Sequence, residues 1–282
     1  MDDLETLATG IRDTETTVAL TGAGISAPSG VPTFRGDDGV WDRFEEGQFT
    51  HGRFRRDPVG FWRDRLELQR AMYGESYEPN AAHEALAALG EAGHLEAIVT
   101  QNTDGLHLEA ARAVTGDEEG AGGGDSGEGA EVLELHGNAH RVVCTACGER
   151  TDAEPILERV DDGEVPPRCN CGGDGGAGGI YKPDVVLFGE RLPPAVLQRA
   201  QNLARESDVF LAVGSSLVVE PAASLPRVAA RNGATVGIVN LEPTPVDELA
   251  DVVCREDVTD TLPRLWATVD GGAGGSDGTG QP

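Results

Sequence analysis

The chain has 282 residues, enough for one large domain or a domain with a smaller insertion, and its 39% hydrophobic residues allow a substantial core. Its 49 acidic residues against 22 basic ones give a formal net charge of −27. This balance argues against a nucleic-acid partner, which would require a basic patch. No run of about 18 apolar residues occurs, so we expect no membrane span and no membrane partner.

Lysine is almost absent from the chain, since Lys182 is the only one and the other basic residues are arginines. An acid excess spread along the whole sequence is typical of proteins kept soluble by self-repulsion in concentrated salt, and we interpret it as halophilic adaptation. The acidic N-terminus lacks the order of a signal peptide, so we expect a cytoplasmic protein. Five cysteines are too few and too clustered for a disulfide framework.

The N-terminal segment predicts a phosphate-binding loop. Residues 2–12 have the apolar spacing of a helix, and the apolar run Thr17–Thr21 reads as a buried strand. It leads into residues 22–27 (GAGISA), which fit the strand–G-x-G-x-x-G/A–helix arrangement of a dinucleotide site. The Gly-, Pro- and Arg-bearing residues 29–41 that follow indicate either a mobile cofactor flap or an ordinary surface loop.

The middle of the chain combines a helical insertion with a second polar loop. Residues 41–79 are rich in aromatic residues and arginine, with helical spacing from Pro58 to Met72. Asn80 is a candidate cap of the next helix, and the strand Ala97–Thr100 follows it. The polar run Gln101–His107 then lies at a strand's carboxyl end, where open α/β sheets bind ligands.

A short apolar segment, Glu131–Gly137 (EVLELHG), presents the candidate general base. It reads as a strand that ends in His136 and a glycine, and an unperturbed imidazole titrates near neutrality. The alternative is a buried histidine satisfied by backbone. The acidic, Gly-rich residues 115–130 predict a flexible loop, and the similar residues 271–282 a disordered tail.

Four cysteines in two close pairs predict a structural metal. They are separated by 21 residues and each pair is followed by glycine, a spacing that fits a tetrahedral zinc site. The alternative is four buried or redox-active thiols. Cys254 stands alone in an apolar run and is predicted to be a core residue. The four candidate ligands are Cys144, Cys147, Cys169 and Cys171.

The alternation of strands and helices resumes after the cysteines. The predicted strands are Pro183–Phe188, Asp208–Val213, Thr235–Val239 and Val252–Cys254, and the predicted helices are Pro194–Glu206, Pro221–Arg231 and one from about Val258. This pattern predicts an α/β fold with a doubly wound, mostly parallel, Rossmann-like sheet and a small insertion domain. We expect the large domain to comprise residues 1–40, 80–140 and 183–270, and the small domain to comprise the helical insertion 41–79 and the zinc-ribbon module 141–182.

Eight sequence blocks, taken together and in order, resemble the sirtuins, the NAD-dependent protein-lysine deacylases. They are GAGIS (22–26), GVPTFRG (30–36), TQNTDGLH (100–107), LHG (135–137), the four cysteines, KPDVVLFGE (182–190), GSSLVVEPAA (214–223) and IVNLEPT (238–244). The resemblance covers nearly all of residues 4–268. It implies that NAD is consumed while an acyl group, foremost acetyl, is removed from lysine, giving nicotinamide and O-acyl-ADP-ribose.

The resemblance also implies roles for particular residues. His136 would be the general base, and the four cysteines would hold one structural Zn²⁺. The residues implied in NAD binding are Gly22, Ala23, Gly24, Ser26, Thr33, Phe34, Arg35, Trp41, Gln101, Asn102, Thr103, Asp104, Gly214, Ser215, Ser216, Asn240, Leu241 and Val258. Those implied to hold an acyl-lysine protein or peptide, bound as an added strand, are Val185, Val186, Phe188, Gly189, Glu190, Leu217 and Val219.

The chain departs from the family pattern at two places. Thr103 stands where an apolar residue is usual. Trp62 and Arg65 lie where some members carry a Tyr and an Arg that bind succinyl-type acyl groups, so they indicate either a partly acid-tolerant acyl pocket or a helix with exposed arginines. Two other functions stay open: a mono-ADP-ribosyltransferase using the same NAD site, and a non-catalytic NAD-sensing zinc-ribbon module. The missing acidic residue after the glycine loop argues against a dehydrogenase.

Overall fold

A large parallel sheet forms the body of the protein in the computed structural model, which describes residues 3–33, 39–40, 43–116, 129–172 and 178–272. Within these ranges six strands pair in the order β3-β2-β1-β7-β8-β9, and every neighbouring pair is parallel. The strands are β1 Thr17–Thr21, β2 Ala97–Thr100, β3 Glu131–Glu134, β7 Val209–Val213, β8 Thr235–Val239 and β9 Val252–Cys254.

The order of the strands fixes where a ligand can enter. The chain builds outward from β1 to β3, then returns to the other side of β1 with β7 and continues to β9. The order reverses between β1 and β7, and in doubly wound sheets the crevice at this reversal binds nucleotides. The central strands β1 and β7 are buried along their whole length, as their apolar residues predict.

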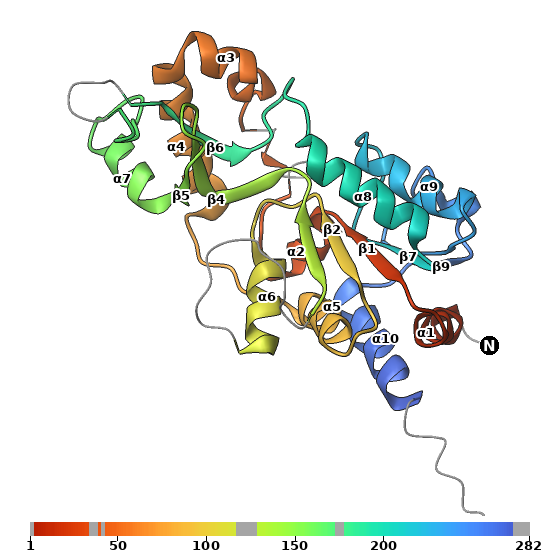
Figure 1. Ribbon diagram of the computed structural model, residues 1–282. Coiled ribbons are helices and arrows are strands. Elements are labelled where there is room, and N and C mark those ends of the chain that lie inside the picture. Colours follow the sequence, from red (N-terminus) through yellow and green to blue (C-terminus); the bar gives the residue numbers. More distant parts are fainter. Residues whose placement is uncertain (1–2, 34–38, 41–42, 117–128, 173–177, 273–282) are drawn as a thin grey trace, which may run out of the picture.

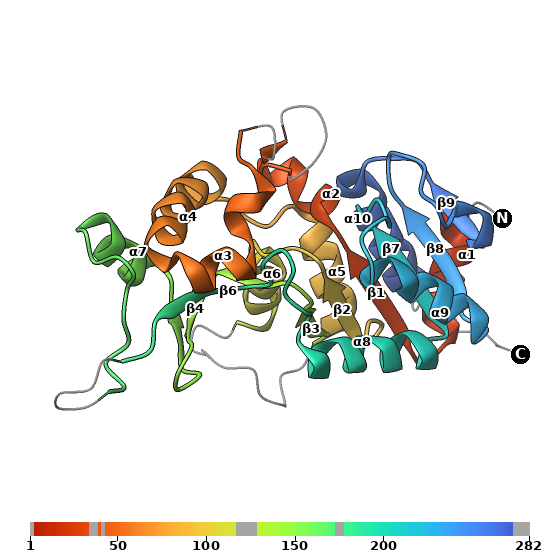
Figure 2. The same cartoon turned by 90° about the horizontal axis from the view of Figure 1, so that it is seen from above.

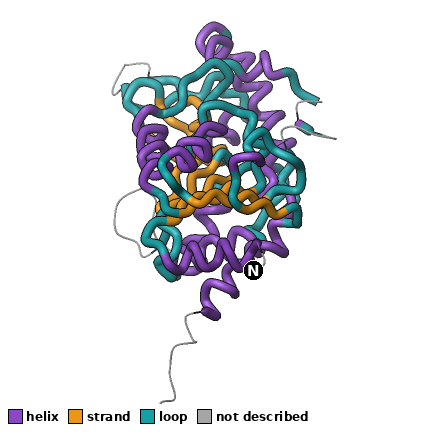
Figure 3. Tube along the Cα trace, turned by 90° about the vertical axis from the view of Figure 1, so that its right-hand side faces the viewer, coloured by secondary structure: helices purple, strands orange, loops and turns teal. Residues whose placement is uncertain are grey.

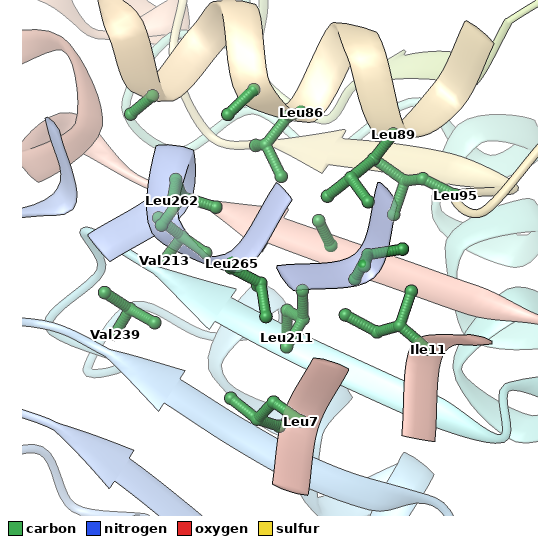
Figure 4. Packing of buried hydrophobic residues seen from close by; sticks show 14 of the residues in the cluster. Leu7, Ile11, Leu86, Leu89, Leu95, Leu211, Val213, Val239, Leu262 and Leu265 are labelled. Carbon is green, nitrogen blue, oxygen red and sulfur yellow. The ribbon is translucent and has the colours of Figure 1, made fainter. Parts of the chain in front are cut away.

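Helices cover both faces of the large sheet (Figure 3). On one face α1 (Asp3–Asp13), α5 (Ala81–Glu91) and α10 (Val258–Gly272) pack with leucines and valines of the strands, as Figure 4 shows for Leu86, Leu211 and Leu265. On the other face α8 (Pro194–Glu206) and α9 (Leu225–Arg231) enclose a second cluster around Phe210. Helix α6 (Leu106–Thr115) packs beside α5.

A smaller lobe lies beside the large sheet (Figures 1 and 2). In the part of the chain that the structure describes, it contains a three-stranded sheet of order β5-β4-β6, with antiparallel pairs. An aromatic core around Phe61 and Trp62 joins this sheet to the surrounding helices. Its elements are β4 Gly137–Cys144, β5 Arg150–Asp152, β6 Tyr181–Val185, α3 His51–Arg56, α4 Pro58–Tyr73 and α7 Glu154–Asp161.

Short helical turns connect these elements. The helix α2 and the 3-10 turns are α2 Ala23–Ser26, η1 Ala27–Ser29, η3 Glu46–Phe49, η4 Ala222–Ser224 and η5 Asp247–Leu249. None of the described helices has both the length and the apolar character that crossing a bilayer requires.

The predicted elements of the large sheet are confirmed, several to the residue. Asn80 caps α5 as predicted, since its side chain accepts from the Ala82 amide at 3.0 Å. The strand predicted over Pro183–Phe188 is wrong: β6 spans Tyr181–Val185 and belongs to the small sheet. The reason is that the Val186 and Phe188 amides donate to the His136 and Phe49 carbonyls, outside the large sheet. The strands β4 and β5 had no prediction.

Candidate active site

Two glycine turns meet where the strand order reverses. The Gly24 amide donates to the Gly214 carbonyl at 2.8 Å, and the Gly22 amide donates to the Val213 carbonyl at 3.1 Å. A Cβ on Gly24 would lie 2.8 Å from the Gly214 backbone, so any side chain there would push β1 and β7 apart. These glycines keep the loops close together and leave backbone surface free for a ligand.

Polar side chains from the loop after β2 pack against the first glycine turn. The side-chain amide of Asn102 donates to the Ser26 hydroxyl at 2.9 Å and to the Gly22 carbonyl at 3.2 Å. Asp104 lies on the same loop as Asn102, and its Oδ1 accepts from the Leu106 amide at 3.0 Å. Burial raises the pKa of the Asp104 carboxyl. A buried carboxylate beside a pocket suits a ligand that brings N–H donors, such as a carboxamide.

A narrow pocket opens between these two loops and α4. The predicted residues Ala23, Ser26, Asn102, Thr103 and Asp104 line it, together with Val31, Pro32 and Tyr73. The Thr103 hydroxyl, which departs from the family pattern, lies 3.0 Å from the Tyr73 hydroxyl. Burial raises the pKa of Tyr73 to about 12. The unusual polar side chain therefore has a polar partner inside the pocket.

His136 lies beyond β3, where the chain leaves the large sheet. Its Nδ1 is 2.9 Å from the Gln101 carbonyl oxygen. Because a carbonyl can only accept, this bond assigns the proton to Nδ1 and leaves Nε2 as the basic nitrogen. Burial lowers the pKa of His136, so the imidazole is neutral at pH 7 and able to take a proton.

His136 forms part of the wall of a second, larger cleft of about 580 Å³. The predicted residues Val186, Phe188, Gly189, Glu190 and Val219 also line it. The other lining residues, which the sequence analysis missed, are Leu187, Arg191, Leu192, Pro194, Leu197, Glu220 and Pro221. Several of them directly follow predicted ones, so extending the motif along the loop would have found them. Val185 and Leu217 do not line the cleft, and Leu217 is buried with φ +52°.

The Gln101 side chain connects the loop after β2 to the loop after β7. The Ser215 hydroxyl donates to Gln101 Oε1 at 2.7 Å, while the Gln101 carbonyl holds His136. The narrow pocket, the strand reversal and the cleft are therefore joined through neighbouring residues of one loop.

Of the remaining predicted cofactor residues, Gly214, Ser215, Ser216, Asn240 and Leu241 directly follow β7 and β8. Ser216 is exposed, Asn240 donates to the Glu242 carbonyl at 2.7 Å, and Leu241 is 61% exposed. Val258 is buried at the start of α10, and the Thr33 carbonyl accepts from the Val40 amide at 3.0 Å. The predicted residues Phe34, Arg35 and Trp41 lie outside the described residues.

Trp62 and Arg65 of α4 are both buried, which excludes a helix with an exposed Arg65. The Trp62 indole donates to the Tyr181 carbonyl at 2.9 Å within the small core. The Arg65 guanidinium donates to Gln69 at 2.7 Å, and no carboxylate of the described residues forms an ion pair with it. Burial lowers the pKa of Arg65 to about 10. Neither side chain lines the two cavities.

The four predicted metal ligands converge in the small lobe. The sulfurs of Cys144 and Cys171 are 3.7 Å apart, those of Cys147 and Cys169 are 3.9 Å apart, and all four lie within 4.8 Å of one another. A tetrahedral zinc with Zn–S bonds of about 2.3 Å separates its sulfurs by about 3.8 Å. The cluster therefore fits Zn²⁺, and four protein ligands leave no open position for catalysis.

Two buried histidines behind the narrow pocket were also missed as site residues. The rings of His83 and His107 are 4.8 Å apart, His83 Nε2 is 3.3 Å from the Ser26 hydroxyl, and His107 Nε2 is 2.9 Å from the Thr21 hydroxyl. The Thr21 hydroxyl also donates to the Thr100 hydroxyl at 2.9 Å. The Thr100 hydroxyl in turn accepts from the backbone amide of Asn102 at 3.1 Å. Tyr73, Val31 and Pro32, which also line the narrow pocket, were missed as well.

The fold and the two cavities define a doubly wound nucleotide-binding protein with a four-cysteine module. The Sir2 family model matches residues 22–221. A curated relative from Haloarcula marismortui, an NAD-dependent protein deacetylase, is 51% identical over 94% of both chains. NAD-dependent protein deacylase 2 of Archaeoglobus fulgidus is 38% identical over 94% of this chain and 95% of its own. The chain therefore belongs to the Sir2 family.

Solved structures agree with this assignment. A Sir2 homologue in complex with ADP-ribose aligns with a TM-score of 0.79 at 32% identity, covering 99% of this chain and 100% of its own. A Sir2 complex with deacetylated p53 peptide and 3'-O-acetyl ADP ribose aligns with a TM-score of 0.75 at 32% identity, covering 95% and 98%. The predicted fold class and family are confirmed.

Proposed function

We propose that this chain is an enzyme that removes acyl groups, foremost acetyl, from protein lysines while consuming NAD, with nicotinamide and O-acyl-ADP-ribose as products. The curated Sir2 relatives support this reaction by their names and by their coverage of the chain. The single observation that carries the proposal is His136: it holds its Nδ1 proton on the Gln101 carbonyl and presents a basic Nε2 within a cleft that adjoins the strand reversal.

We assign NAD to the crevice at the strand reversal. The glycine turn 22–24 and Ser26 would meet the pyrophosphate, and Thr33 with Phe34, Arg35 and Trp41 would cover it. Asn102 and Asp104 would hold the nicotinamide end, because the buried Asp104 carboxyl suits a carboxamide. The adenosine half would lie over the loops after β7 and β8, next to Gly214, Ser215, Ser216, Asn240, Leu241 and Val258.

The acyl-lysine peptide would enter the large cleft as an added strand between residues 189–190 and 217–219. Val186 and Phe188, which line the cleft, would surround the lysine stem, and Val185 would flank Val186 from outside the cleft. Arg65 does not line the cleft, but it is buried and forms no ion pair with a carboxylate of the described residues, and a carboxylate on an acyl group that reached it would supply one. We therefore propose that the acyl pocket tolerates acidic groups, with Trp62 as the packing that supports α4.

His136 supplies the proton chemistry of the reaction. In the proposed reaction the acyl oxygen would first attack the anomeric carbon of the NAD ribose and expel nicotinamide. The neutral imidazole of His136 would then take a proton from a ribose hydroxyl, so that this oxygen attacks the imidate carbon and the lysine amine leaves. The bond from Nδ1 to Gln101 orients the ring and stabilises the imidazolium once the proton has moved. Ser215 in turn holds the Gln101 side chain, so the loop carrying this carbonyl is fixed from two sides.

The four cysteines would hold zinc as a structural element of the small domain. We propose the domain division predicted from the sequence, in which residues 41–79 and 141–182 form that domain. Cytoplasmic location and the lack of a nucleic-acid partner stay predictions.

The test is turnover in molar salt with NAD and acetyl-, propionyl- or succinyl-lysine peptides, followed by mass spectrometry. We expect peptide mass loss with release of nicotinamide, and a loss of about 10²- to 10⁴-fold in His136→Ala, with His94→Ala as the matched control. Equal rates in His136→Ala would refute the assignment of the base. Peptide mass gain would indicate ADP-ribosyl transfer, and NAD binding without nicotinamide release would indicate the non-catalytic module.

A further inference from the structure

The chain's only lysine occupies a site with three acceptors. Lys182 lies on β6, and its side chain is 12% exposed. Its Nζ donates to the Val185 carbonyl at 2.7 Å and to the Pro183 carbonyl at 3.1 Å, and it lies 3.0 Å from Glu190 Oε2. These three acceptors match the three N–H donors of an ammonium group.

Glu190 connects this ammonium to the cleft. The same oxygen, Oε2, accepts from the Leu187 amide at 2.9 Å, and the Glu190 amide donates to the Leu187 carbonyl at 2.9 Å. Residues 187–190 therefore form a tight turn. One backbone hydrogen bond and one bond to the Glu190 carboxylate close this turn, and the same carboxylate forms the ion pair with Lys182. All four residues of this turn line the large cleft.

The wall that this turn forms has no regular secondary structure apart from one bridge between Phe188 and Thr50. It runs from the end of β6 to the start of α8, and its backbone is tied at three other points, one of which is the His51 amide donating to the Phe188 carbonyl at 3.0 Å. The Val186 amide donates to the His136 carbonyl at 2.9 Å, and the Phe188 amide donates to the Phe49 carbonyl at 3.2 Å. The Lys182–Glu190 pair adds a side-chain contact to these backbone bonds.

We propose that Lys182 is a positioning residue for the acyl-lysine peptide, acting through Glu190 to fix the wall formed by residues 186–190. This inference rests on the proposed function, because it takes the large cleft as the peptide site. Lys182 does not line the cleft and touches neither pocket. Its effect is to keep the Glu190 carboxylate turned inward on the Leu187 amide, and so to hold Gly189 and Glu190 where they would pair with a peptide strand.

The composition of the chain supports this role. Arginine stands at the other 21 basic positions, and its planar fork suits paired or exposed carboxylates. A compact tetrahedral ammonium suits two carbonyls and one carboxylate that converge on a single point. The single lysine thus lies where three acceptors converge on its ammonium group. The Lys182→Met substitution would keep an unbranched side chain and remove the ammonium donor from all three acceptors, at a cost typical of lost charge-assisted bonds.

The experiment compares Lys182→Met, Lys182→Arg, Glu190→Gln and the double variant in steady-state kinetics, after wild-type turnover on an acetyl-lysine peptide has been established. We expect Lys182→Met to raise the peptide KM about tenfold with kcat and the NAD KM unchanged, and Lys182→Arg to restore part of the loss. The double variant should be no worse than the weaker-binding single variant, because the two residues act as one unit. Hydrogen exchange in residues 186–190 should become faster in Lys182→Met.

Arg70→Gln is the matched control, since it removes a cation from an exposed ion pair with Asp161 on the surface of the small lobe. An unchanged peptide KM in Lys182→Met, with unchanged hydrogen exchange in residues 186–190, would overturn the proposal. It would also be overturned if the double variant raised the peptide KM by the product of the Lys182→Met and Glu190→Gln factors, because the two residues would then act independently. If Lys182→Met does not fold, the Glu190→Gln variant decides by the same two measurements. Failure of the proposed function is separate, because it would show as absent turnover in the wild type.

Discussion

Acid should destabilise the fold through the buried imidazole pair behind the narrow pocket. His83 is fully buried and His107 is 3% exposed. The Asn80 amide lies 3.3 Å from His83 Nδ1 and can only donate, so His83 is neutral with its proton on Nε2. Burial lowers the pKa of His83 to about 4 and that of His107 well below 6.5. Unfolding returns both rings to water and to ordinary pKa values.

The sign and size follow from linkage. Between pH 6.5 and 4 the unfolded chain binds a proton at His83 that the folded chain does not, so the free energy of unfolding falls as the pH falls through this window. A folded pKa of about 4 against 6.5 corresponds to a loss of about 2 kcal/mol at pH 5 and about 3 kcal/mol at pH 4. His107 acts with the same sign. Asp104, whose pKa is raised, acts with the opposite sign.

The assay is urea unfolding at constant molar salt, at pH 7.5 and pH 5, for the wild type and His83→Gln. The variant starts less stable, because it loses the contacts to Asn80 and Ser26, but it should lose about 2 kcal/mol less on acidification. The half-buried His94 gives the control His94→Gln, which should keep the full loss. An equal loss in the wild type and His83→Gln would refute the reasoning.

Three further predictions concern the site. Chelating the metal, or Cys147→Ser, should unfold the three-stranded sheet and abolish turnover, because a structural zinc contributes on the order of 10 kcal/mol to such modules; zinc content and circular dichroism check this, and full activity in metal-free protein would contradict it. Arg65→Met should lower the succinyl-to-acetyl ratio of kcat/KM about tenfold, measured with matched peptides; an unchanged ratio would exclude Arg65 from the acyl pocket. In the pH profile of kcat/KM, the fall in activity at acid pH should have its midpoint below pH 6.5, since burial lowers the pKa of His136. A midpoint above pH 6.5 would contradict this.

The large sheet could be predicted from sequence because its signals are local. Thr17–Thr21 and Val209–Val213 are short apolar runs bounded by glycine loops, and both are strands at those positions. The small sheet could not, because β4 mixes polar and apolar residues, as Asn138 and Arg141 show, and its partner β6 lies far along the chain. The run Val186–Phe188 was misassigned because apolar residues that line a cleft read like those of a buried strand.

The site shows the same division between local and long-range information. The residues of the glycine loop and Gln101–Asp104 could be placed at strand ends, where the structure has them. No local pattern could bring Tyr73 to Thr103, since their hydroxyls meet only because α4 of the small lobe packs over the loop after β2. The burial of Arg65 likewise depends on that packing, so the sequence alone left it open between an exposed helix and a pocket.

His136 lies where the chain passes from the large sheet to the small one, and this crossing fixes the position of its backbone. The Leu135 amide still donates to the Thr100 carbonyl of β2, whereas Gly137 already pairs with Val185 in the small sheet. Gly137 has φ +76°, and a Cβ there would lie 2.0 Å from the Asp184 carbonyl oxygen, so only glycine allows the turn. The imidazole is thus fixed by both sheets at once. Any movement of the small lobe relative to the large one would therefore shift the base and the cleft wall together, since Val186 is bonded to the His136 carbonyl.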